Sequence, residues 1–184
     1  MHLVFATSLV PAGRPSTGYE IANAAVLDSL RRIGVRVTVL GFVWPGLSPD
    51  HPDTTIVLGE QDVRNETASR WQKGEWLATA LAGGFTFASA KMRTISPRDV
   101  RAAIDRLGPV DGYILNSVQF AGAFPDIFRD RPSIYIAHNV EHRSASENAA
   151  AARGAVERLL FQREARLLAR VEARLCADAA FVFT

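Results

Sequence analysis

The chain has 184 residues, of which 48% are hydrophobic and 22% are charged, the mixture of an ordinary globular domain rather than of a disordered or fibrous chain. Its formal net charge of +2 is too small to indicate nucleic-acid binding, so we expect no nucleic-acid partner. The single cysteine, Cys176, excludes an internal disulfide and is typical of a reducing cytoplasm, and no apolar run reaches the roughly 18 residues of a membrane span.

The first forty residues read as a strand, a loop, a helix and a second strand. Residues 2–8 are a short, nearly continuous apolar run, which is typical of a strand covered on both faces. After a loop rich in Pro, Gly and Ser, residues 19–33 carry apolar side chains near helical spacing and end at Gly34, a common helix stop. Residues 35–41 alternate as a strand does. This order predicts a right-handed βαβ unit.

The rest of the chain continues this alternation. Ser96 as N-cap, Pro97 at the first helical position and Gly108 as stop predict a helix between them. Further strands are expected at 54–59, 111–117, 133–138 and 179–184, with helices at 118–128 and from about Ser144 to Cys176. The pattern predicts an α/β domain with a doubly wound, mostly parallel, Rossmann-like sheet. Because the sequence stops on so apolar a strand, we expect residues 1–184 to be one domain that a second domain follows.

The loop after the first predicted strand is one candidate site, because open α/β sheets bind ligands outside the carboxyl ends of their strands. Gly13, Ser16, Thr17 and Gly18 could bring backbone N–H groups close to a phosphate, beside the positive end of the next helix. The alternative is an ordinary connection in which Ser16 or Thr17 caps that helix. The G-x-G-x-x-G fingerprint of NAD sites is absent, and we expect no cofactor.

Polar residues also follow two later predicted strands. Asn116, with Ser117 and Gln119 after it, contacts a ligand or caps the next helix. His138 directly follows the apolar run 133–137 and is a substrate contact or a satisfied structural histidine.

His138, Glu141 and His142 follow the order H-x-x-E-H, one form of a zinc-peptidase motif. Such a site needs both histidines on one face of a single helix. A break from strand to loop at His138 removes that geometry, so we expect no metal site.

The segment from 133 to 184, which begins SIYIAHNVEH and ends ADAAFVFT, resembles the end of the N-terminal domain of family 4 glycosyltransferases of the GT-B fold. In that family a strand ends in a histidine, often followed by Asn and Glu. A long helix with Glu-Ala-Arg turns comes next, and an A-D-x-x-F-V segment leads to another strand. The segment 18–41 resembles the family's first βαβ unit, and 81–92, LAGGFTFASAKM, resembles an apolar loop in the middle of the domain.

The resemblance implies an enzyme of bacterial polysaccharide biosynthesis, a hexosyltransferase-like protein that is retaining and independent of metal. It would move a sugar from a nucleotide-sugar donor to a glycan, lipid-linked or small acceptor. The present chain would recognise the acceptor, and a C-terminal domain absent from it would hold most of the donor, so the fragment alone should be inactive. His138 matches the family histidine that contacts the transferred sugar, and Asn139 and Glu141 match the residues after it. We expect a cytoplasmic protein, with peripheral membrane contact left open.

Three alternatives stay open at this point. The chain could instead be a self-standing, non-catalytic module that binds phosphate or sugar. The arginine-rich face of the long predicted helix is either solvated or in contact with a membrane surface, while its apolar residues are expected in the core. These apolar residues are Leu159, Leu160, Leu167, Leu168, Val171 and Leu175. The aromatic residues Trp71, Trp76, Phe85 and Phe87 either stack on sugars or cover the sheet.

Overall fold

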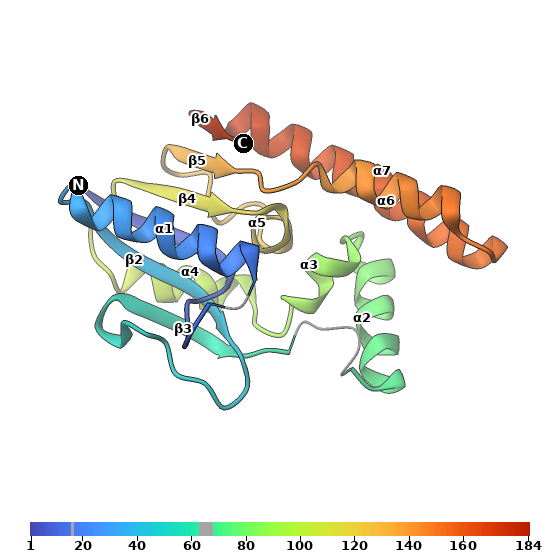
Figure 1. The fold of residues 1–184 in the computed structure, drawn as a ribbon, viewed down its shortest axis with the longest axis horizontal. Coiled ribbons are helices and arrows are strands. Elements are labelled where there is room, and N and C mark those ends of the chain that lie inside the picture. Colours follow the sequence, from blue (N-terminus) through green and yellow to red (C-terminus); the bar gives the residue numbers. More distant parts are fainter. Residues whose placement is uncertain (16, 63–67) are drawn as a thin grey trace.

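The structure is a computed structural model that describes residues 1–15, 17–62 and 68–184. Six strands form one sheet in the order β3-β2-β1-β4-β5-β6, and every neighbouring pair is parallel (Figure 1). The strands are β1 (His2–Leu9), β2 (Arg36–Val43), β3 (Thr55–Glu60), β4 (Gly112–Asn116), β5 (Ser133–Ile136) and β6 (Phe181–Phe183). The predicted doubly wound, Rossmann-like fold is thus confirmed, and each predicted strand lies within about two residues of its expected place.

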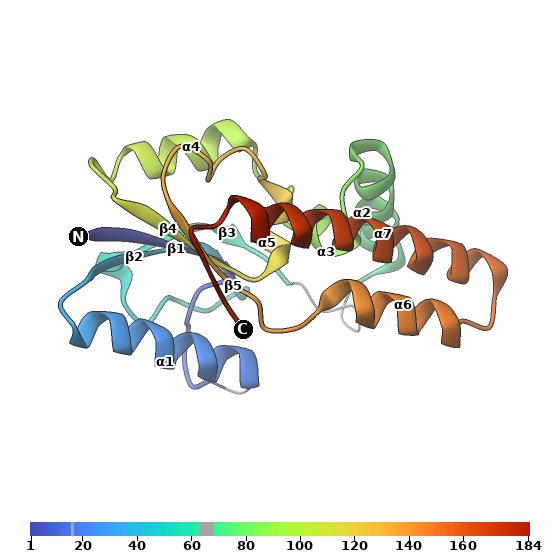
Figure 2. The ribbon, with the colours of Figure 1, turned by 90° about the horizontal axis from the view of Figure 1, so that it is seen from above.

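Helices cover both faces of this sheet. They are α1 (Gly18–Arg32), α2 (Arg70–Gly83), α3 (Phe87–Lys91), α4 (Pro97–Asp105), α5 (Val118–Ala123), α6 (Glu141–Ala151) and α7 (Ala155–Asp178), with a 3-10 turn, η1 (Pro52–Thr54). Figure 2 shows α1 on one side of the sheet and α4 on the other. Alternate strand residues face the two sides, so Phe5 and Ile114 pack with α1, whereas Val4, Tyr113 and Leu115 pack with α4 and α5.

The single long helix expected from about Ser144 to Cys176 is wrong. The chain forms two antiparallel helices, α6 and α7, which project together beyond the sheet (Figures 1 and 2). The break has a local cause: Ala152 is extended, with ψ 131°, and Gly154 becomes the N-cap of α7. The expected helix 118–128 is also shorter, because the α region is disfavoured for the residue before Pro125 and α5 ends at Ala123.

The first turns of α7 lie at the projecting end of this hairpin, and two of its leucines are not in the core. Leu159 is 62% exposed and Leu160 is 37% exposed, against the expectation that both are buried. Leu168, further along α7, is 6% exposed and packs with Val118 and Ala145. The core prediction therefore fails for these two leucines, which lie where α7 extends past the sheet.

Residues 70–83 and 87–91 are helical, although 81–92 was expected to resemble an apolar loop. Ser69 caps α2 through a capping box with Gln72, and Gly84 ends the helix with φ 67°. Trp76 is 7% exposed and meets Phe87 of α3 edge to face at 6.1 Å, so it is buried in the contact between α2 and α3. Trp71, by contrast, is 79% exposed.

The helix pair α2–α3 is attached to α7 by polar contacts. The Glu164 carboxylate accepts a hydrogen bond of 2.7 Å from the Phe87 N–H, at the start of α3. Burial raises the pKa of Glu164, while this backbone bond acts against the rise. Arg163 donates to the carbonyls of Ala80 and Phe85 at 2.6 and 3.1 Å, which satisfies groups at the end of α2.

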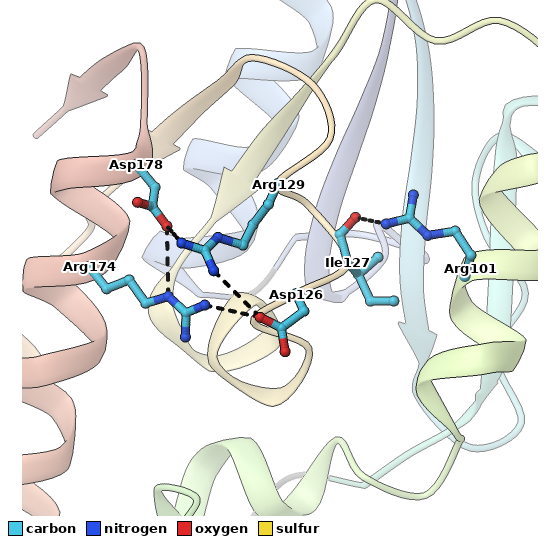
Figure 3. Close-up of polar contacts among 6 residues, drawn as sticks. All are labelled: Arg101, Asp126, Ile127, Arg129, Arg174 and Asp178. Atoms are coloured by element: carbon cyan, nitrogen blue, oxygen red, sulfur yellow. Dashed lines mark hydrogen bonds and ion pairs between the residues drawn. The ribbon is translucent and has the colours of Figure 1, made fainter.

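Ion pairs attach the connection between α5 and β5 to its neighbours (Figure 3). Arg174 of α7 lies 3.0 Å from Asp126, and Asp178 lies 3.2 Å from Arg129. On the other side of this connection, Arg101 of α4 donates to a backbone carbonyl. The connection that leads into β5 is therefore held between two helices, and this orients the strand that precedes His138.

Candidate functional site

Polar side chains converge at the carboxyl edge of the sheet, beside the two central strands. The strand order runs outward in both directions from β1 and β4, so their connections leave toward opposite faces of the sheet. A crevice outside the carboxyl ends of such strands is where open α/β sheets bind ligands. Thr7 lies near the carboxyl end of β1 and pairs with Asn116, the last residue of β4. His138 lies two residues after the end of β5. The candidate site lies at the carboxyl ends of these strands.

Asn116 is the centre of the site and is only 1% exposed. Its Nδ2 lies 2.8 Å from Asn23 Oδ1, 2.9 Å from the Tyr19 hydroxyl and 3.2 Å from Thr7 Oγ1. Its Oδ1 lies 2.8 Å from His138 Nε2. The amide therefore links β1, α1, β4 and the loop after β5. Its side chain forms hydrogen bonds across the edge of the sheet. It does not cap α5, which was the alternative expected for Asn116.

The Asn116 bond determines which nitrogen of His138 carries the proton. An amide oxygen only accepts, so Nε2 must donate, and in the neutral ring Nδ1 then keeps a lone pair. Burial lowers the pKa of His138 from its ordinary value of 6.5, which favours this neutral form at pH 7. The Tyr19 ring packs against the imidazole edge to face at 4.9 Å. Within the described residues Nδ1 has no hydrogen-bond partner, so it is available to a ligand.

The loop after β1 contributes less to the site than the sequence suggests. The Gly13 N–H already donates to Asp50 Oδ1 at 2.6 Å. Thr17 is the N-cap of α1 and forms a capping box with Glu20, so the capping alternative is confirmed for this residue. Gly18, the first residue of α1, has open space where a side chain would be. Ser16 lies outside the described residues.

The Asp50 contact matters because a carboxylate lies where the phosphate of a ligand was expected. Asp50 also donates its own N–H to the Pro11 carbonyl at 3.0 Å, so the two loops are joined at two points. Of the expected phosphate contacts that are described, the N–H groups of Gly13 and Thr17 already donate to carboxylates, and Gly18 lies at the N-terminus of α1.

Glu141 and His142 are the first two residues of helix α6. Both contact Glu172 of α7. Glu172 of α7 is 9% exposed and accepts the Glu141 N–H at 2.7 Å. Its carboxylate also pairs with His142 Nδ1. Burial, with repulsion from Glu172, raises the pKa of Glu141, and a hydrogen bond from Asn139 acts against the rise.

The H-x-x-E-H order therefore does not form the face of one helix. His138 lies in the loop after β5 and bonds to Asn116, whereas His142 lies in α6 and bonds to Glu172. Among the residues that the structure describes, no group of three His, Cys, Asp or Glu side chains could hold a metal ion. In the same residues, no helix is long and apolar enough to cross a membrane.

Sequence reasoning missed Thr7, Tyr19 and Asn23. A weak signal was present, because Tyr19 and Asn23 are four residues apart and share one face of α1. Thr7 was hidden inside an apolar strand pattern. Comparisons of the chain with profiles of protein families, with curated proteins and with solved structures found no match. The geometry of this site and the sequence resemblance are therefore the observations that bear on function.

Proposed function

We propose that this chain is the acceptor-side, N-terminal domain of a retaining, metal-independent glycosyltransferase. A second domain would hold most of the nucleotide-sugar donor, and the acceptor would be a glycan, a lipid-linked sugar or a small molecule. The observation that carries the proposal is the bond between His138 and Asn116. It orients the histidine of the family-like segment at the carboxyl edge of the sheet, with one ring nitrogen open to a ligand.

The chemistry of sugar transfer assigns roles to these groups. A retaining transfer passes through an oxocarbenium-like sugar while a diphosphate leaves. The neutral His138 ring can accept a hydrogen bond from a sugar hydroxyl through Nδ1 and thereby position the sugar. The N-terminus of α1 at Gly18 can contribute N–H groups and a positive dipole end to the leaving diphosphate. The donor domain would supply the remaining catalytic groups.

The hairpin of α6 and α7 supports contact with an anionic membrane surface, where a lipid-linked acceptor would be found. Val156, Leu159 and Leu160 lie at helical spacing on the first turns of α7 and are 72%, 62% and 37% exposed. Arg153 precedes them and Arg158 lies among them next to Glu157, and all three charged residues are exposed. Apolar side chains beside arginines are the combination that binds the headgroup region of anionic bilayers. On this proposal the protein acts at the cytoplasmic face of the membrane.

One observation favours the other candidate, a self-standing sugar-binding module without catalysis. The Gly13 N–H is already bonded to Asp50, which leaves less of the first loop for a diphosphate than a transferase would use. Such a module would bind sugars through the Asn116 site and would never transfer them.

A transfer assay on the protein with its donor domain separates these candidates. Tritiated sugars from a panel of nucleotide sugars would be followed into glycan and lipid acceptors, for the wild type and for His138→Ala. We expect the variant to lower turnover by about 10²–10³-fold, the usual cost of losing a contact to the transition state, with a much smaller loss of stability from the lost bond to Asn116. The exposed histidine in His51→Ala is the matched control and should keep full turnover. Wild-type turnover in His138→Ala, or binding without any transfer, would contradict the proposal.

A further inference from the structure

Ser117, directly after Asn116, has a backbone conformation that serine rarely adopts. Its φ is 75° and its ψ is 162°, a region that glycine occupies almost alone. Among the described residues it is the only one other than glycine with a positive φ. Backbone strain of this kind persists where the surrounding structure holds it, often beside a ligand site.

The Ser117 side chain is a second, independent anomaly. The residue is 8% exposed, and its Oγ is buried without a hydrogen-bond partner in the part of the chain that the structure describes. The side chain of a serine at the N-cap of a helix normally accepts a hydrogen bond from a backbone N–H in the first turn. Ser117 is the N-cap of α5 but its side chain makes no such bond. A buried hydroxyl without a partner is destabilising, and glycine at this position would remove both costs.

Ser117 directly follows Asn116 and therefore borders the site already described. Its N–H donates to the carbonyl of Ile136 at 3.0 Å, so it lies beside the end of β5, two residues before His138. The other side chains at this point are an amide, hydroxyls and an imidazole whose pKa is lowered by burial. A neutral set of donors and acceptors is suited to sugar hydroxyls, whereas phosphates are bound mainly by cations and by backbone N–H groups.

We propose that the Ser117 hydroxyl is a specificity contact that hydrogen-bonds one hydroxyl group of the bound sugar. The ligand completes the hydrogen bonding of Oγ, which the protein itself leaves unsatisfied. The inference rests on the proposed sugar-binding function and adds to it a residue that selects between sugars differing at one hydroxyl.

The test measures sugar binding and stability on the same proteins. The 184-residue chain would be titrated by NMR with the methyl glycosides of glucose, galactose, mannose and N-acetylglucosamine. Ser117→Gly and Ser117→Ala should each raise the Kd of the bound glycoside about tenfold, the loss expected for one hydrogen bond. Ser29→Ala, which removes an exposed hydroxyl in α1, is the matched control and should leave the Kd unchanged.

Two further readouts separate a specificity contact from a structural role. Without ligand, Ser117→Gly should raise Tm by about 2–4 °C, because the strained backbone and the unsatisfied hydroxyl are both relieved. One deoxy analogue of the bound glycoside should lose about tenfold in affinity for the wild type and nothing for Ser117→Ala.

The outcomes distinguish this inference from the proposal beneath it. If both Ser117 variants bind as tightly as the wild type while His138→Ala does not bind, the specificity contact is wrong and the sugar site stands. A lower Tm in Ser117→Gly would show that the hydroxyl is structural and would also overturn the contact. If the wild type binds none of the glycosides, the sugar site and the contact fail together.

Discussion

At the scale of single residues, the charge state of His138 is linked to the stability of the fold. The pKa of its ring is lowered in the folded protein because burial disfavours the cation. The unfolded chain therefore binds a proton more readily than the folded one. This contribution to stability is complete above pH 6.5, the ordinary value, and is lost as the pH falls through the lowered pKa.

The prediction is a difference in pH dependence between the wild type and His138→Gln. Glutamine can still donate an N–H to Asn116 but does not titrate, so the wild type should lose stability relative to the variant as the pH falls below 6.5. Urea denaturation at pH 7.5, 6.5 and 5.5, read as free energies of unfolding, measures this difference.

Comparison with the variant is necessary because two carboxyls act in the opposite sense. The pKa values of Glu141 and Glu164 are raised above 4.5, mainly by burial, so their contributions are lost as the pH rises through those values. Both glutamates are present in both proteins and cancel in the difference. Parallel stability curves for the wild type and His138→Gln would show that the ring does not change its protonation on folding.

At the scale of secondary-structure elements, α7 has two parts with different surroundings. The part near Leu168 packs on α5 and α6, while the first turns carry exposed apolar side chains. An exposed leucine contributes little to stability, so its replacement by a charged residue should barely change the free energy of unfolding. The same replacement removes apolar area from any membrane contact and adds repulsion from anionic lipids.

We therefore predict that Leu159→Glu lowers binding to vesicles by at least about tenfold, since the apolar contact of one leucine is worth about 2 kcal/mol. The vesicles would contain phosphatidylcholine with about one third phosphatidylglycerol, and cosedimentation would measure the bound fraction. Ile33→Glu is the matched control, because Ile33 is 75% exposed at the end of α1, far along the chain from the hairpin. Equal loss in both variants, or no vesicle binding by the wild type, would contradict a membrane role for the hairpin.

At the scale of the whole molecule, the close approach of β1 and β2 holds the site in place. Gly41 of β2 lies against Thr7, and a Cβ at this position would come within 2.3 Å of the Thr7 carbonyl oxygen. This oxygen belongs to the backbone and cannot move without shifting the strand. Thr7 in turn bonds to Tyr19 and Asn116, so a displaced strand would also disturb the site.

Gly41→Ala should accordingly destabilise the protein by about 2–3 kcal/mol, the upper part of the usual range for an overpacked core. Gly74→Ala provides the control, because Gly74 is within α2 and a Cβ there meets nothing within 4 Å. That change should stabilise by about 0.5–1 kcal/mol through helix propensity. Chemical denaturation measures both values, and equal stabilities for the two variants would show that the strands can move apart without cost.

The sequence alone determined the fold class and the positions of the strands. Buried parallel strands are short continuous apolar runs, and the segments 2–8 and 133–138 show this directly. Ser96 and Pro97 likewise predicted the start of α4 at its observed residue, because capping is chemistry between neighbours in the chain. His138 and Asn116 could be selected as candidates for the same reason, since each follows a recognisable strand.

Only the tertiary structure decided what those candidates contact. Asn116 meets residues 93 and 109 positions earlier in the chain, and no local pattern encodes such a meeting. The strand order brings β1 beside β4, and this order depends on how whole layers pack. The break before Gly154 and the exposure of Leu159 were likewise not predictable from the sequence. A helical pattern shows which face of a helix is apolar, but it does not show whether another element covers that face.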